Sequence, residues 1–159
     1  MLKRVFYVIL FIFSWSGIYA QDVKVTRFEE LQKRIQTSSD TVYVVNFWAT
    51  WCVPCVKELP YFEKLATKYK DQPLKVILYS LDFKSKIQKD VLPFLRKYKV
   101  ELEVVVNECN NEKFINLVDK NWSGAIPATL VVNTKKGIRK FYEQEFTEKE
   151  LEQVYISSR

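Results

Sequence analysis

The sequence predicts an α/β fold in which helices flank a mixed central sheet. Two segments, 42–48 and 74–80, are rich in β-branched and aromatic residues and have almost no polar break. Such runs are typical of strands buried on both faces, as in a sheet covered by helices. The segments between them have apolar residues at helical spacing. The segment 138–142 follows a turn that contains Gly137, which predicts an antiparallel last strand and therefore a mixed sheet.

The remaining elements follow from the same patterns, taken in chain order. We expect a short edge strand at 23–25, a helix at 27–36 with Thr26 as its N-cap, a helix at 53–69, a helix at 87–98, a strand at 101–107, a helix at 112–121, a strand at 129–133 and a final helix opened by the capping box of Thr147 and Glu150.

The composition excludes several classes of function. The 159 residues favour one domain, and the 48% of hydrophobic residues supply a sizeable core. With only three glycines there is no phosphate-binding loop and no dinucleotide fingerprint, and the absence of histidine excludes Ser-His, Cys-His and His-metal sites. The formal net charge is +6, but basic and acidic residues are interleaved. We therefore expect no nucleic-acid partner and no cofactor.

The first 20 residues have the pattern of a secretory signal peptide. Lys3 and Arg4 precede an apolar run at 5–13, and the segment 14–20 then leads to an expected cleavage site after Ala20. We predict a signal peptide at 1–20 and a single domain at 21–159, which would place the domain in the periplasm or outside the cell. The bulky Ile18 near the cleavage site leaves open an uncleaved N-terminus that anchors the protein to the membrane.

Two cysteines lie where the buried strand at 42–48 ends and the next helix begins. Cys52 falls at the first helical turn, where unpaired backbone N–H groups and the helix dipole favour a thiolate. Cys55 lies three residues later on the same helix face, and Pro54 suits an early helical position. This arrangement predicts that Cys52 is a nucleophile and that Cys55 resolves the mixed disulfide, leaving a redox-active Cys52–Cys55 disulfide.

The string Asn46–Pro60 (NFWATWCVPCVKELP) resembles the thioredoxin superfamily, and within it the extracytoplasmic TlpA/ResA-like thiol-disulfide oxidoreductases. The resemblance extends from about residue 41 to the C-terminus and implies a thioredoxin-like fold. It also identifies the helix at 87–98 and the strand at 101–107 as the insertion typical of this group. Half of a zinc site is the competing interpretation of a Cys-X-X-Cys pair, but three cysteines without histidine do not supply four ligands.

The resemblance also implies roles for residues outside the cysteine pair. Glu58, one helical turn after Cys55, corresponds to a glutamate thought to assist deprotonation of the thiols; the alternative is a surface carboxylate. Pro127 corresponds to the cis-proline of thioredoxin-like proteins. The backbone of Ile126 would then face the cysteines and bind an extended substrate, with Trp51 completing an apolar docking rim. Asn46 replaces the buried aspartate of ordinary thioredoxins and cannot accept a proton.

We therefore expect an exported protein-disulfide reductase. Its partners would be disulfide-containing exported proteins, and the resemblance implies a membrane electron donor of the CcdA/DsbD type and work in cytochrome c maturation. The dipeptide Val53-Pro54 lacks the histidine of strong oxidases, which favours reduction. We expect a monomer. Two other classes stay open: a thioredoxin-like binding module without turnover, and a thiol peroxidase.

Cys109 lies in a polar loop, and the sequence does not assign it a role. A regulatory disulfide or a third redox thiol is the functional interpretation, and an incidental free thiol is the simpler one.

Overall fold

A computed structural model describes residues 23–37, 40–109 and 111–159. The predicted signal peptide at 1–20 lies outside the described residues. No helix in the described part of the chain is long and apolar enough to cross a bilayer.

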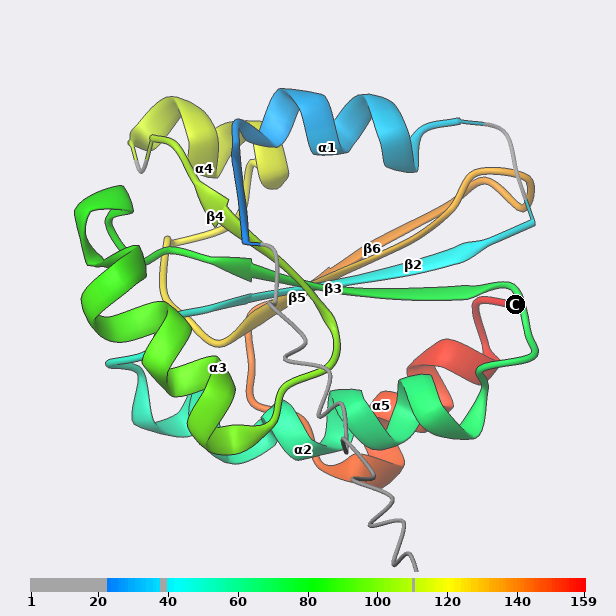
Figure 1. The fold of residues 1–159 in the computed structure, drawn as a ribbon. Coiled ribbons are helices and arrows are strands. Elements are labelled where there is room, and N and C mark those ends of the chain that lie inside the picture. The colour runs from blue at the N-terminus through cyan, green and yellow to red at the C-terminus, as the bar shows by residue number, and fades with distance from the viewer. Residues whose placement is uncertain (1–22, 38–39, 110) are drawn as a thin grey trace, which may run out of the picture.

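Six strands form one mixed sheet in the order β1-β4-β3-β2-β5-β6 (Figure 1). The strands are β1 (Lys24–Thr26), β2 (Val42–Trp48), β3 (Leu74–Ser80), β4 (Glu103–Asn107), β5 (Ala128–Asn133) and β6 (Ile138–Tyr142). The first four in this order are parallel to one another, whereas β5 is antiparallel to both β2 and β6. The predicted α/β class, the mixed sheet and the antiparallel last strand are confirmed.

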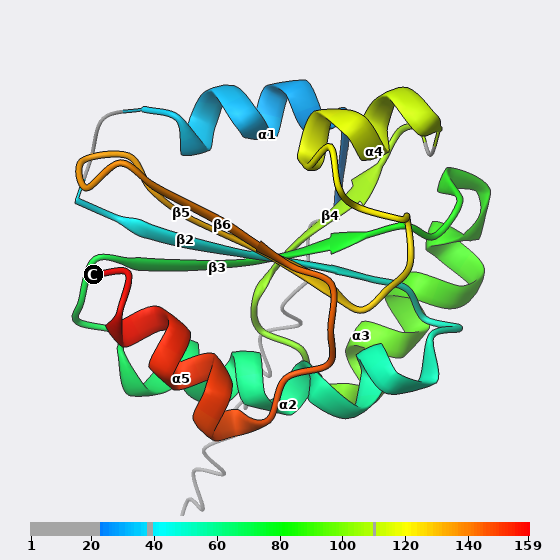
Figure 2. The same cartoon turned by 180° about the vertical axis from the view of Figure 1, so that it is seen from behind.

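Helices cover both faces of the sheet. They are α1 (Phe28–Ile35), α2 (Val53–Lys68), α3 (Leu92–Tyr98), α4 (Glu112–Val118) and α5 (Glu148–Ile156). Helices α1 and α4 lie on one face, and α2, α3 and α5 lie on the other, as seen from opposite sides in Figures 1 and 2. The described residues therefore form two cores, one on each side of the sheet.

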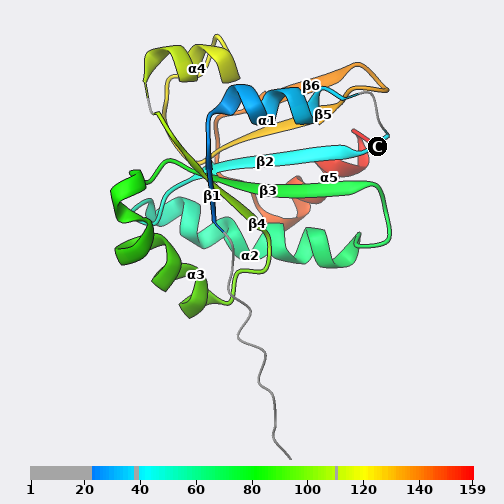
Figure 3. The same cartoon turned by 45° about the horizontal axis from the view of Figure 1, so that its top comes forward.

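Strand β2 is shared by the two cores, as its sequence predicts. Val44 and Trp48 point to the core under α2, while Val45 and Phe47 point to the core under α1. All four are fully buried. Strands β2 and β3 are paired in parallel along their whole length, from Val42 opposite Leu74 to Trp48 opposite Ser80. Both strands therefore end at the same edge of the sheet. Figure 3, in which the top of the molecule is turned toward the viewer, shows β3 and β2 side by side above α2.

Several predicted boundaries are wrong. The N-cap of α1 is Arg27, without a side-chain cap, because Thr26 is the last residue of β1. The predicted helix at 112–121 stops at Val118, where Asp119 turns to an extended backbone conformation. By contrast, the capping box of Thr147 and Glu150 is confirmed.

The inserted helix at 87–98 is not a single α-helix. A 3₁₀ turn, η1 (Lys84–Lys86), leads into a π-helical turn, η2 (Ile87–Val91), and only then does α3 begin. Pro93 lies in the first turn of α3. Proline has no N–H, and its ring clashes with the carbonyl group four residues earlier in an α-helix, so the preceding turn takes the wider π form.

Candidate active site

The cysteine pair lies at the start of α2 and forms a disulfide. Cys52 and Cys55 are joined by an S–S bond of 2.06 Å. Cys52 is the N-cap residue of α2, and its sulfur accepts the backbone N–H of Cys55 at 3.3 Å. Pro54 lies in the first turn, where its missing N–H leaves no bond unmade. The predicted placement of both sulfurs at a helix N-terminus is confirmed.

The two sulfur-bearing residues differ in access. Cys52 retains 5% of its surface exposed and Cys55 retains none. A partner can therefore reach Cys52 first, whereas Cys55 is covered by its own helix and the core.

The segment before β5 lies directly beside Cys52. The Ile126–Pro127 peptide bond is cis, as predicted. The carbonyl oxygen of Ile126 lies 3.7 Å from the sulfur of Cys52. The oxidised sulfur has no proton to donate, so this is a contact across the site rather than a hydrogen bond. It shows that residues 74 positions apart in the chain form one surface.

Glu58 is buried rather than exposed, against the alternative of a surface carboxylate. Its Oε1 accepts a hydrogen bond from Nδ2 of Asn46 at 2.8 Å, and its Oε2 accepts one from the backbone N–H of Phe146 at 2.8 Å. Burial raises the pKa of Glu58 to about 7, although both hydrogen bonds lower it and nearby Glu145 raises it further. The carboxyl can therefore exchange a proton near neutral pH.

Asn46, on β2, connects Glu58 to the neighbouring strand β5. Its Nδ2 also lies 3.3 Å from Oγ1 of Thr129 and 3.5 Å from the carbonyl oxygen of Ala128, both on β5. Within the described residues, its buried Oδ1 has no partner. The sequence showed only that Asn46 cannot accept a proton, and it did not predict this hydrogen bond to Glu58.

Exposed apolar side chains flank Cys52 in the chain, and Phe83 lines the same groove as Trp51. Trp51 is 66% exposed, Val53 is 65% exposed and Phe83 is 69% exposed. The exposure of Trp51 agrees with the predicted docking rim, whereas Phe83 was not predicted to take part. Large exposed apolar side chains that gather in one place are typical of surfaces that bind a partner.

Asp82 holds the turn that precedes Cys52, and sequence reasoning missed it. Its carboxylate accepts hydrogen bonds from the backbone N–H of Thr50 at 2.9 Å, from Oγ1 of Thr50 at 2.7 Å and from Oγ of Ser80 at 2.8 Å. Asp82 is 2% exposed. A signal was available, because parallel strands end at the same edge of a sheet. A carboxylate just after β3 therefore had to lie close to the turn after β2.

Cys109 lies apart from this constellation. It is an exposed free thiol in the loop after β4, and Nδ2 of Asn111 lies 3.1 Å from its sulfur. It is not among the residues that contact the disulfide, Glu58 or Asp82. The functional and the incidental interpretations of this thiol both stay predictions.

Comparisons with known proteins agree with this geometry. The model of the AhpC/TSA family matches residues 17–141. Thioredoxin-like protein YneN of Bacillus subtilis is 27% identical over 87% of this chain and 77% of its own length. Thiol-disulfide oxidoreductase ResA of Halalkalibacterium halodurans is 28% identical over 69% of this chain, which spans only 57% of that protein.

A solved structure, the thioredoxin-related protein of Neisseria meningitidis serogroup B, superposes with a TM-score of 0.62. It is 29% identical and covers 77% of this chain and 90% of its own. The cysteine pair thus lies at a helix N-terminus of a thioredoxin-like fold, in a chain whose relatives include proteins named thiol-disulfide oxidoreductases. The chain belongs to the thioredoxin-like AhpC/TSA family.

Proposed function

We propose that the protein is a thiol-disulfide oxidoreductase of the ResA type that reduces disulfides in exported proteins. The observation that supports this best is the Cys52–Cys55 disulfide at the start of α2, with the carbonyl group of Ile126 beside the more accessible sulfur. Relatives named thiol-disulfide oxidoreductases support the class of reaction.

The proposed reaction begins with Cys52 as a thiolate. It attacks one sulfur of the client's disulfide, forming a mixed disulfide and releasing the client's other sulfur as a thiolate. Cys55 then loses its proton and attacks the sulfur of Cys52. This step forms the Cys52–Cys55 disulfide, releases the second client thiolate and transfers two electrons to the client.

Glu58 is the proposed acceptor of the proton of Cys55. The two residues are three positions apart, which places them on the same side of α2. A carboxyl with a pKa of about 7 is matched to proton transfer near neutral pH, and the chain has no histidine that could take this role. Trp51 and the Ile126–Pro127 segment are the proposed docking surface for the client backbone.

Export is part of the proposal and rests on the signal-peptide pattern at 1–20. Cleavage would place the domain in the periplasm or outside the cell, where disulfides persist. Regeneration of the dithiol then requires a donor thiol, for which a membrane protein of the CcdA/DsbD type is the candidate. Apocytochrome c is a candidate client.

Trapping tests the proposal. In a Cys109→Ser background, which removes the exposed free thiol, a Cys55→Ser variant expressed in its native host should accumulate as a mixed disulfide through Cys52. Mass spectrometry then identifies the client. The matched control is the Cys52→Ser variant in the same background, which should trap much less. Equal trapping by the two variants, or none by either, would contradict the proposal.

A further inference from the structure

A groove opens beside the disulfide, between the turn that carries Trp51 and the start of the insertion. It has a volume of about 560 Å³. Its lining residues are Thr50, Trp51, Asp82, Phe83, Lys86, Lys89, Asp90 and Phe94. Phe94 packs on Trp48 with ring centroids 5.2 Å apart, so the groove is backed by the core of the domain.

The part of the groove nearest to the cysteine pair is apolar. Trp51 adjoins Cys52 in the chain, and Phe83 adjoins Asp82, whose carboxylate binds Thr50. Trp51 and Phe83 are 66% and 69% exposed, so neither aromatic ring is used to build the core. An exposed aromatic pair next to a reactive sulfur favours an apolar side chain of the molecule that reacts there.

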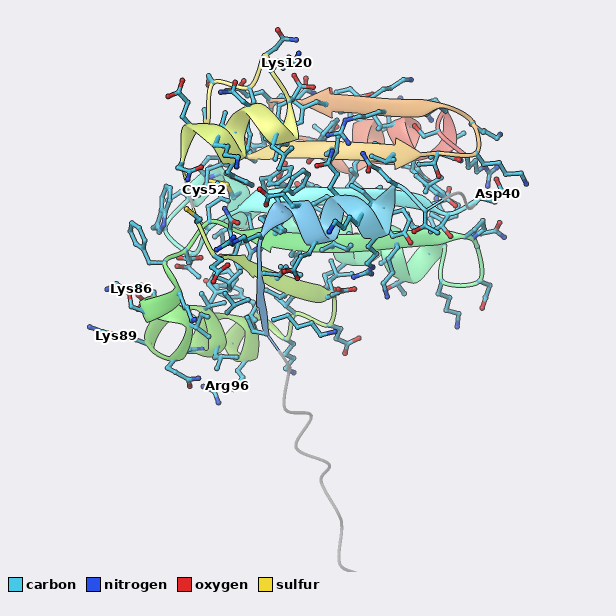
Figure 4. All side chains as sticks on the ribbon, turned by 90° about the horizontal axis from the view of Figure 1, so that it is seen from above. Asp40, Cys52, Lys86, Lys89, Arg96 and Lys120 are labelled. Carbon is cyan, nitrogen blue, oxygen red and sulfur yellow. A yellow bond between two sulfur atoms is a disulfide. The ribbon has the colours of Figure 1, made fainter. Side chains whose placement is uncertain are left out.

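The outer part of the groove is charged, and its charges are not all compensated. The carboxylate of Asp82 is engaged with Thr50 and Ser80. Asp90 lies 3.6 Å from the ammonium group of Lys86. Lys89 forms no ion pair within the part of the chain that the structure describes, which leaves one ammonium group free. Figure 4 shows Lys86 and Lys89 projecting outward on the same side of the molecule as Cys52.

We propose that this groove binds the segment of a client chain that flanks its disulfide, with an apolar side chain against Trp51 and Phe83 and a carboxylate at Lys89. The proposal rests on the proposed disulfide exchange and adds a preference among clients to it. Charge complementarity at Lys89 favours this occupant, because Asp82 is buried and Asp90 lies beside Lys86, which leaves Lys89 as the exposed charge of the lining that a carboxylate can pair with. The π-helical turn η2 places Lys89 on this groove, which gives the insertion a role in client choice.

The test uses short peptides that each contain one intramolecular disulfide and differ only in the flanking pair: Phe-Glu, Phe-Lys or Ala-Glu. The protein, reduced and in a Cys109→Ser background, is mixed with each peptide in a stopped-flow instrument. The second-order rate constant for formation of the Cys52–Cys55 disulfide is measured at low salt. Lys89→Glu reverses the charge in the groove. Lys120→Glu is the matched control, since Lys120 is exposed and projects from a different part of the molecule in Figure 4.

The Phe-Glu peptide should react about threefold faster than the Phe-Lys peptide, as a single exposed charge pair allows. Lys89→Glu should invert this order, Lys120→Glu should preserve it, and 1 M salt should abolish it. Phe83→Ala should remove the advantage of Phe-Glu over Ala-Glu, whereas Ile156→Ala, at an exposed apolar residue of α5, should retain it.

Three results would overturn the proposal. If all peptides react at the same rate, or if Lys89→Glu leaves the order unchanged, the groove does not select the client while the disulfide exchange itself stands. If no peptide oxidises the reduced protein, the proposed function fails, and the groove proposal fails with it.

Discussion

The carboxyl of Glu58 is held between two opposing influences. Burial favours its protonated form, and the hydrogen bonds from Asn46 and from the backbone of Phe146 favour its ionised form. Burial dominates, which raises the pKa to about 7. The same residue therefore connects the proposed proton transfer to the stability of the fold.

The stability of the protein should depend on this carboxyl as the pH changes. Below about pH 4.5, Glu58 is protonated in both the folded and the unfolded chain. As the pH rises to 7, the folded state must either keep a proton or bear a buried charge, so it loses stability. Relative to Glu58→Gln, the unfolding free energy of the oxidised protein should fall by roughly 3 kcal/mol between pH 4.5 and pH 8. Chemical denaturation at both pH values measures this, and a difference that does not vary with pH would be the contrary result.

Asn46 should lower the pKa of Glu58. Asn46→Leu removes one of the two hydrogen bonds that favour the carboxylate, so the pKa should rise above 7. Thr129→Val is the matched control, because it removes the 3.3 Å neighbour of Asn46 but no partner of Glu58. The carboxyl band of Glu58, followed by difference infrared spectroscopy against pH, reports the pKa. A value that falls or does not change in Asn46→Leu would contradict this account.

At the scale of single residues, the sequence predicted the types of side chain but not all of their partners. Cys52 and Cys55 stand in one continuous motif, so their placement at a helix start follows from local pattern. The cis bond at Pro127 was predicted only through the family resemblance. The hydrogen bonds of Glu58 come from β2 and from the loop before α5, which are 12 and 88 positions away. Only the packing of α5 against α2 brings Phe146 to this carboxyl.

At the scale of elements, the turn between β2 and α2 is fixed by the neighbouring strand. The carboxylate of Asp82 accepts three hydrogen bonds from Thr50 and Ser80, and it is shielded from water. These bonds set the direction in which the chain leaves β2, and so they position Trp51 and Cys52. Asp82 is thus a positioning residue, not one that reacts.

Removing the carboxylate of Asp82, which anchors the turn between β2 and α2, should destabilise the domain. Asp82→Ala leaves the N–H and the hydroxyl group of Thr50 and the hydroxyl group of Ser80 without their acceptor, which should cost about 2 kcal/mol of unfolding free energy. Asp40→Ala, which removes an exposed carboxylate 3.1 Å from Lys135, should cost less than about 0.5 kcal/mol. Urea denaturation measures both, and equal losses would show that Asp82 is not an anchor.

The elements that the sequence predicted best are those with a strong local signal. Strands β2 and β3 and the hairpin before β6 agree with expectation because buried apolar runs and Gly137, with a φ of +64°, leave few alternatives. The insertion differs from the single α-helix that was predicted, because Pro93 disfavours an α-helical turn before it. Apolar spacing does not distinguish a π turn from an α turn. The groove described above lies in this part of the fold.

At the scale of the whole molecule, topology brings the site together. The parallel strands β2 and β3 end at one edge of the sheet, and β5, which is antiparallel to β2, begins there. The cysteine pair, Asp82 and the Ile126–Pro127 segment therefore meet although they lie far apart in the chain. A mixed sheet was predicted, and this convergence is its consequence.

The direction of electron transfer is also a property of the whole protein. The dipeptide Val53-Pro54 has no group that would stabilise the reduced form through the Cys52 thiolate. The reduction potential should lie nearer to about −270 mV, as in thioredoxin, than to about −120 mV, as in DsbA. Equilibration with glutathione or dithiothreitol buffers measures it. A potential close to that of DsbA would make the protein an oxidase.

The most direct test of the central claim follows electrons from this pair to another protein. The purified, reduced protein, carrying Cys109→Ser, is mixed with a protein that has one accessible disulfide, and both are analysed by mass spectrometry after acid quenching. One Cys52–Cys55 disulfide should form for each client disulfide lost, and the Cys52→Ser variant should show no such exchange. A reduced protein that leaves every accessible disulfide intact, or a Cys52→Ser variant that reduces them equally well, would contradict that claim.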